Sequence, residues 1–203
     1  MCYLRIIAAP FIIFIILYES IFSNLFPFTL LEGTSFGNFL RDNFDAGNSF
    51  AIIIAGVIFL LAMLTDALDG YFARKYNVVS DKGKSLDPIA DKILILGTFF
   101  AFWALGTPPD RAIMIYPLIV IALREVIISV MRSYVAKRKR MVGASVWGKI
   151  KTFVQTLSLL VIFTAEFVHY PIFGHAAMFV AAFVTLLSLF PYVFNFIKVL
   201  KEE

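Results

Sequence analysis

The sequence is poor in charge and has a single cysteine. Only 16% of its 203 residues are Asp, Glu, Lys or Arg, against about 25% in a soluble domain, while 61% are hydrophobic. This imbalance excludes a water-soluble globule. The 23 phenylalanines exclude a disordered chain, because so much apolar surface cannot stay solvated. The lone Cys2 excludes an internal disulfide and a cysteine metal cluster. A membrane protein with several spans remains.

Long runs without charge predict six membrane spans. A helix needs about 20 residues to cross the hydrocarbon core, so six spans fill roughly 120 residues and leave room for one domain, residues 1–203. We therefore predict an all-α bundle of six transmembrane helices. The apolar segments are 6–28, 46–65, 93–109, 112–134, 152–165 and a long run after Glu166 that is divided at Pro171 and Gly174. The loops are expected at 31–45, 75–85, 107–111, 137–146 and 170–175.

Lysine and arginine gather on one side of the predicted bundle. With the N-terminus inside, the inner loops hold Lys75, Lys82, Lys84 and the basic block 137–140. The outer loops hold only Arg41 and Arg111. Because cytoplasmic loops are enriched in these residues, both termini are predicted to lie in the cytoplasm. The basic block is interpreted as a topology signal, with contact to anionic lipids as the alternative.

Four aspartates lie at the inner ends of the second and third spans. Asp66 and Asp69 are three residues apart, and Asp87 and Asp91 are four apart, so each pair shares one helix face. The two spans are predicted to form an antiparallel hairpin in which the four carboxylates converge. Oxygen ligands suit Mg²⁺ or Mn²⁺, and two such ions would neutralise the cluster and bind phosphate oxygens. Ordinary surface charges at helix ends are the alternative.

The residues beside these aspartates also suit a phosphate ligand. Gly70 costs about 1 kcal/mol relative to Ala inside a helix, which is reasonable if a ligand approaches the backbone closely. Ala73 keeps the same face small, and Arg74 supplies a cation suited to a diphosphate. Asp87 followed by proline is also typical of a helix N-cap, so a capping role is expected for it as well.

Together these residues resemble the signature of the CDP-alcohol phosphotransferases. The string reads Asp66-x2-Asp69-Gly70-x2-Ala73-Arg74-x8-Gly83-x3-Asp87-x3-Asp91. The resemblance implies a six-span membrane enzyme that forms a homodimer. In the implied reaction, an alcohol displaces CMP from a CDP-linked lipid, and two divalent ions assist the enzyme. It also implies that the aspartates bind the metals, and that Gly70, Ala73, Arg74 and Gly83 bind the CDP-lipid. Arg5 matches an arginine that precedes the first span in family members.

A second region is similar to the bacterial branch of this family that couples CDP-diacylglycerol to sn-glycerol 3-phosphate. The residues that carry the similarity are Arg124-Glu125-Val126-Ile127-Ile128-Ser129-Val130-Met131-Arg132 and Gly148-Lys149-Ile150-Lys151-Thr152-x2-Gln155. Each segment presents one helix face that can point toward the aspartates. Arg124, Arg132, Lys149 and Lys151 are therefore candidates for binding the acceptor phosphate. Lys149 and Lys151 lie about 200° apart around a helix, so one of them can face lipid headgroups instead. Pairing of Arg124 with Glu125 or another buried carboxylate is the alternative for that residue.

The predicted reaction transfers the phosphatidyl group from CDP-diacylglycerol to sn-glycerol 3-phosphate, giving phosphatidylglycerophosphate and CMP. Asp91 is the candidate catalytic base. The enzyme is expected in the cytoplasmic membrane of a bacterium, with its site facing the cytoplasm and no nucleic-acid partner. One alternative is a sibling enzyme with another acceptor, such as inositol phosphate, serine or phosphatidylglycerol. A remote one is a divalent-cation transporter.

Overall fold

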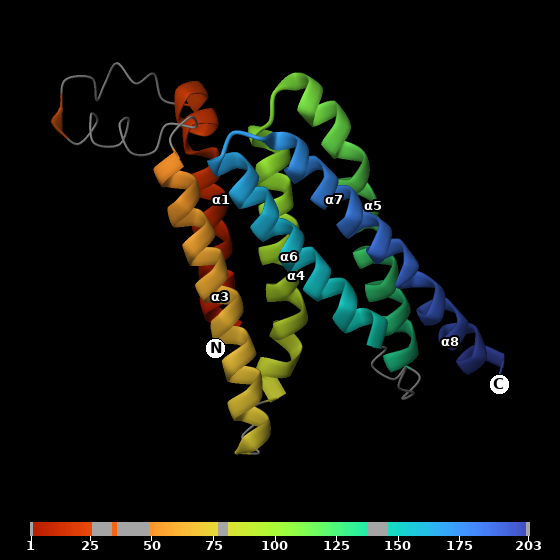
Figure 1. Cartoon of the computed structure of the whole chain (residues 1–203). Helices are drawn as coiled ribbons and strands as arrows, with labels where there is room; N and C mark the ends of the chain where they lie inside the picture. The colour runs from red at the N-terminus through yellow and green to blue at the C-terminus, as the bar shows by residue number, and fades with distance from the viewer. Residues whose placement is uncertain (1, 26–33, 36–48, 77–80, 138–145, 202–203) are drawn as a thin grey trace.

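Helices account for nearly all of the chain that the computed structural model describes, which comprises residues 2–25, 34–35, 49–76, 81–137 and 146–201. Consecutive long helices run in opposite directions, and α8 continues the course of α7 (Figure 1). The all-α prediction is confirmed for these residues. The helices are α1 (Cys2–Leu25), α3 (Ser49–Lys75), α4 (Asp81–Leu105), α5 (Pro108–Lys137), α6 (Val146–Phe167), α7 (Pro171–Leu187) and α8 (Leu189–Lys201).

Among the described residues, three helical stretches are long and apolar enough to cross a membrane. They are Pro108–Val135, Trp147–Phe167 and Pro171–Phe194. Shorter apolar stretches, Arg5–Leu17 and Ala51–Thr65, lie within α1 and α3. The composition and these helices together make the chain a membrane protein. The full count of six spans stays a prediction.

Three predicted loops are shorter than the sequence indicated. The loop expected at 107–111 is one of them, because α5 already begins at Pro108. The chain is helical up to Lys75 and again from Asp81, so Asp87 lies inside α4, six residues after its start. The prediction of Asp87 as an N-cap is wrong, because the polar segment before it adds further helical turns instead of a loop. The chain between α6 and α7 is likewise confined to 168–170, because helix α7 begins at Pro171, a residue suited to a first helical position.

The turn between α6 and α7 holds a histidine where glycine is usual. His169 has a positive φ of 57°. The Tyr170 N–H donates to the Ala165 carbonyl at 2.9 Å across this residue, as in a glycine-capped helix end. For a residue with a Cβ, the left-handed conformation raises the conformational free energy by about 1–2 kcal/mol, so this turn is strained.

Helix α1 packs against both α3 and α4. Small residues such as Ala9 and Ala101 are buried in this part of the bundle, and an added Cβ at Gly97 would lie 2.7 Å from Cδ1 of Ile13. Small residues let membrane helices approach closely. Along their described residues, α3 and α4 make little direct contact with each other. Helices α3 and α4 run in opposite directions, as the hairpin prediction requires (Figure 1). Much of the packing between them is mediated by α1.

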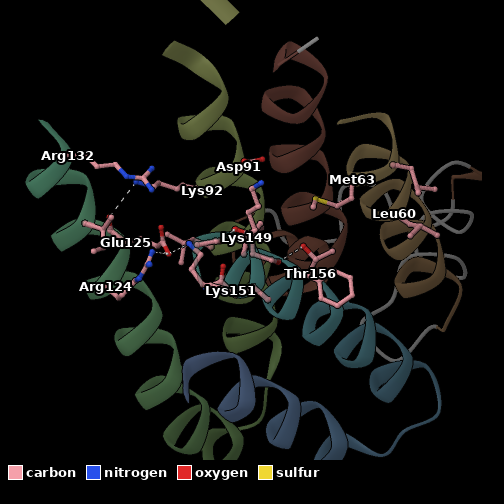
Figure 2. A pocket seen from close by; sticks show the side chains of 18 residues that line it. Leu60, Met63, Asp91, Lys92, Arg124, Glu125, Arg132, Lys149, Lys151 and Thr156 are labelled. Carbon is pink, nitrogen blue, oxygen red and sulfur yellow. Dashed lines mark hydrogen bonds and ion pairs between the residues drawn. The ribbon is translucent and has the colours of Figure 1, made fainter. Parts of the chain in front are cut away.

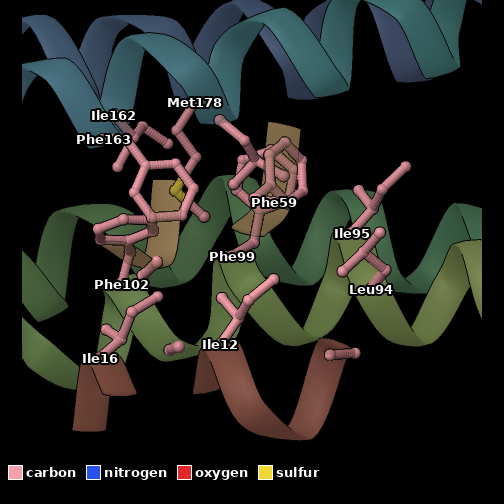
Figure 3. Close-up of a cluster of buried hydrophobic side chains, with 14 of the residues drawn as sticks. Ile12, Ile16, Phe59, Leu94, Ile95, Phe99, Phe102, Ile162, Phe163 and Met178 are labelled. Carbon is pink, nitrogen blue, oxygen red and sulfur yellow. The ribbon is translucent and has the colours of Figure 1, made fainter. Parts of the chain in front are cut away.

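An aromatic core holds α3, α4, α6 and α7 together (Figure 3). The ring of Phe163 meets that of Phe102 edge-on, with centroids 4.7 Å apart, and that of Phe59 at 5.7 Å. Phe99 and Met178 are fully buried beside them. Edge-to-face pairs of this kind add to the free energy gained by close packing.

Candidate functional site

A cavity of about 800 Å³ lies between α3, α4, α5 and α6. Its α3 wall is apolar, formed by Leu60, Met63 and Leu64, whereas the other three helices supply polar and charged side chains (Figure 2). The cavity is formed by the end of α5 and the start of α6, at the end of the bundle where α1 begins and α8 ends (Figure 1). The charged lining residues are Asp91, Lys92, Arg124, Glu125, Arg132, Lys149 and Lys151.

The two helix faces singled out in the sequence both line this cavity. Arg124, Ile128 and Arg132 do so at four-residue intervals along α5. On α6 the lining face is formed by Gly148, Lys149, Lys151, Thr152, Gln155 and Thr156, with Phe153 beside it. The four predicted acceptor-binding cations thus surround one space, although their binding of a phosphate stays a prediction.

A buried carboxylate links two of these cations. Oε1 of Glu125 accepts hydrogen bonds from the Lys151 ammonium and, at 3.2 Å, from Nη1 of Arg124. All three side chains are buried, with Arg124 5%, Glu125 6% and Lys151 8% exposed. Buried charges need such partners because desolvation is costly. The alternative that Arg124 pairs with Glu125 is therefore confirmed, and Arg124 lines the cavity at the same time.

Arg124 keeps one donor unused. Its Nε is buried and has no hydrogen-bond partner within the described part of the chain. A buried donor without a partner costs about 1–3 kcal/mol.

Lys92 and Glu125 belong to the cavity but were not among the predicted site residues. Lys92 donates to Oγ of Ser129 and, at 3.5 Å, to the Glu125 carbonyl. Each residue directly follows a predicted one, Asp91 or Arg124. The signal that would have found Glu125 is a charge inside a predicted span, which by default marks a functional site.

Lys149 and Lys151 differ in burial. Lys151 is buried against Glu125, whereas Lys149 is exposed, and both contribute to the cavity wall. Neither lysine is turned away from the cavity, and contact of one of them with lipid headgroups stays a prediction.

Asp91 faces the same cavity as the cations and is paired with the first helix. Its Oδ1 accepts a hydrogen bond from Nη1 of Arg5, which is almost fully buried at the start of α1, while the Asp91 side chain is 39% exposed. The residue predicted to act as the base is therefore held at the cavity wall and remains accessible.

The other predicted ligands are located only as positions on helices. Asp66, Asp69, Gly70, Ala73 and Arg74 are in α3, and Gly83 and Asp87 are in α4. Their side chains lie outside the described residues, so the convergence of the four carboxylates stays a prediction. Among the side chains that are described, no group of three or more His, Cys, Asp or Glu residues could hold a metal ion. The outer loop at 31–45 is outside the description except for 34–35.

Comparisons with known proteins agree with the sequence motifs. Residues 1–187 match a family model described as CDP-alcohol phosphatidyltransferase. The chain is 35% identical over 153 residues to a CDP-diacylglycerol–glycerol-3-phosphate 3-phosphatidyltransferase of Rickettsia felis, covering 73% of this chain and 82% of the relative. A protein of the same name from Bacillus subtilis is 34% identical over 152 residues, covering 73% and 76%. A third from Mycoplasma pneumoniae is 40% identical over 110 residues, covering 54% and 46%.

Proposed function

The chain belongs to the CDP-alcohol phosphatidyltransferase family, and we propose that it transfers the phosphatidyl group from CDP-diacylglycerol to sn-glycerol 3-phosphate, releasing CMP. The observation that carries the proposal is one cavity in which Asp91 faces a cluster of arginines and lysines. The names of the relatives from Rickettsia felis and Bacillus subtilis support the same reaction.

The cations favour an acceptor that bears a phosphate group. Arg124 lines this space together with the exposed Arg132 and Lys149. Guanidinium and ammonium groups bind phosphate oxygens through charge-assisted hydrogen bonds. We assign the acceptor phosphate to the space between α5 and α6. Free serine carries no phosphate and no net charge, so it would neutralise these cations less well than a phosphate ester.

Two divalent ions, Mg²⁺ or Mn²⁺, fit the carboxylates of α3 and α4 as a donor set. We assign Asp66, Asp69 and Asp87 to one ion, and Asp66, Asp87 and Asp91 to the second. When bound, such ions hold the diphosphate oxygens and stabilise negative charge on them. Gly70, Ala73, Arg74 and Gly83 are assigned to the CDP end of the lipid.

Asp91 is the base in the proposed reaction. Its carboxylate takes the proton from the attacking glycerol hydroxyl. The hydroxyl oxygen forms a bond to the phosphorus that carries diacylglycerol, and the bond from that phosphorus to the bridging oxygen breaks, so CMP leaves. The ion pair with Arg5 orients Asp91 toward the cavity.

The apolar part of the cavity wall suits the lipid substrate. Leu60, Leu64 and Phe153 lie beside the charged residues. Leu60 also lines a second, almost wholly apolar cavity of about 260 Å³ between α3 and α6. A site with one charged wall and one apolar wall matches a lipid that joins acyl chains to a charged nucleotide.

The finer topology is part of the same proposal. We assign six spans in one domain, residues 1–203, to the bacterial cytoplasmic membrane, with both termini and the site on the cytoplasmic side, and the chain to a homodimer. The support is the gathering of basic residues in the inner loops and the position of the cavity at the end where α1 begins and α8 ends (Figure 1).

The reaction is tested with purified protein, Mg²⁺, CDP-diacylglycerol and labelled glycerol 3-phosphate, which should yield CMP and a labelled lipid. Replacing the acceptor by inositol phosphate, serine or phosphatidylglycerol separates the sibling activities. Faster turnover of any of these would replace glycerol 3-phosphate in the proposal. Metal uptake into protein-containing liposomes without lipid substrate would instead favour the transporter.

Asp91→Asn tests the base. We expect at least a hundredfold lower kcat, because the amide cannot accept the proton, in a range typical of general-base removal, about 10²–10⁴-fold. Asp110→Asn, a carboxylate at the opposite end of the bundle, is the matched control and should retain activity. A near wild-type rate in Asp91→Asn would remove Asp91 from this role.

A further inference from the structure

The last apolar segment is broken between α7 and α8. Helix α7 ends at Leu187, and α8 begins at Leu189. Pro191 explains the position of the break, because a proline has no N–H and its ring clashes with the carbonyl four residues earlier, here that of Leu187. Ser188 stabilises the break by donating its N–H to the Val184 carbonyl at 3.0 Å and its Oγ to the Thr185 carbonyl at 2.6 Å.

The break is tied to the cavity wall. Gln155, which lines the cavity on α6, donates its Nε2 to Oγ1 of Thr185 at 2.9 Å. Gln155, Thr185 and Ser188 are all almost fully buried. A buried polar network with satisfied hydrogen bonds fixes one arrangement of its helices. These hydrogen bonds therefore connect the cavity wall to the break between α7 and α8.

Beyond the break, Tyr192 lies against α5. It is only 3% exposed, and the guanidinium carbon of Arg132 stands over its ring, 5.6 Å from the ring centroid. A cation within about 6 Å of an aromatic face is attracted by the ring quadrupole. Helix α8 packs on both α5 and α7, which holds this ring in place.

We propose that Tyr192 is a positioning residue of the acceptor site, holding the Arg132 guanidinium at the cavity rim through its ring face. Arg132 is exposed, so without this support its long side chain would sample many rotamers. Holding it in place lowers the entropy lost when a phosphate binds. The proposal rests on the proposed function, since it takes the acceptor to be a phosphate ester. It makes the C-terminal helix part of a site that the sequence placed on the second to fifth spans.

The test compares Tyr192→Leu with Tyr192→Phe. Phe keeps the aromatic face, whereas Leu removes it. For Tyr192→Leu we expect the KM for glycerol 3-phosphate to rise about five- to tenfold, with kcat and the KM for CDP-diacylglycerol within about twofold of wild type. Tyr192→Phe should restore the KM to within about twofold. Phe194→Leu, a highly exposed aromatic position on the same helix, is the control and should change nothing.

A double-mutant cycle links the effect to Arg132. In an Arg132→Gln background, Tyr192→Leu should raise the KM by less than about twofold, because the partner is already lost. Where Tyr192→Leu does not fold, Tyr192→Met fills more of the space and carries the same expectation. An unchanged KM in the Leu or Met variant, an equal rise in Tyr192→Phe, or a fall in kcat alone would overturn the proposal. Failure of the proposed function is distinguishable, because the wild type would then release no CMP with glycerol 3-phosphate.

Discussion

The two ends of this helix bundle bury opposite kinds of side chain. Along α4 and α6, the turns near the cavity carry Lys92 and Lys151, whereas later turns of the same helices carry Phe102 and Phe163. Charges inside a membrane helix are costly and by default functional, while packed aromatic rings supply van der Waals attraction. The difference teaches that the residues for catalysis and the residues for folding stability lie at different ends of the helices. A substitution at one end should therefore affect mainly activity, and a substitution at the other end mainly stability.

The largest expected effect comes from the charged end. Glu125→Gln leaves the buried Lys151 and Arg124 without their carboxylate, and the two cations then repel each other. Breaking a buried ion pair costs about 3–5 kcal/mol. We also expect kcat/KM for glycerol 3-phosphate to fall about 10²–10³-fold, because the two cations that line the cavity lose the carboxylate that holds them in position. Steady-state kinetics with varied acceptor concentration measures it.

Glu166→Gln is the matched control for that variant. Glu166 is a partly buried carboxylate on α6, near the opposite end of the same helix. It should retain kcat/KM within about twofold, because it lies far from the cavity wall. Equal losses in the two variants would mean that the charged end has no special part in activity.

A substitution at the aromatic end should lower the stability of the protein and leave its activity nearly unchanged. Phe163→Ala removes the ring that meets both Phe102 and Phe59, and we expect a loss of about 2–4 kcal/mol in the free energy of unfolding. The folded fraction should keep its kcat within about twofold. Unfolding in mixed detergent micelles measures the stability, with Phe173→Ala, an exposed ring on α7, as control. A loss of kcat in Phe163→Ala protein that is still fully folded would contradict the assignment of this end to stability alone.

The smallest effect is expected at the turn between α6 and α7. His169→Gly removes the cost of a positive φ, and the greater freedom of glycine in the unfolded chain offsets part of the gain. We expect a net stabilisation of about 0.5–1 kcal/mol with unchanged activity. A lower unfolding midpoint in His169→Gly would show that the imidazole itself stabilises this end.

Local patterns in the sequence predicted the helices and the cationic faces well. Apolar runs mark the helices because the hydrocarbon core demands them, and the spacing of Arg124, Ile128 and Arg132 identified a lining face because four residues make about one turn. The N-cap assigned to Asp87 was wrong because the helix begins earlier, at Asp81.

Contacts between distant segments could not be predicted in this way. Arg5 and Asp91 form an ion pair although they are 86 positions apart in the sequence, and no sequence periodicity predicts such a contact. Lys92 and Glu125 were not among the predicted site residues, and each points about 100° away from its predicted neighbour, Asp91 or Arg124, around the helix. The cavity is wide enough for both members of each pair to line it.

The position of α1 bears on how the protein is made. This helix precedes α3 and α4 in the chain and so leaves the ribosome before them. It contacts both of these helices, and its Arg5 is paired with Asp91. Helices α3 and α4 therefore cannot reach their final arrangement by folding as an isolated pair. They need the surface of α1, a helix that is synthesised before either of them.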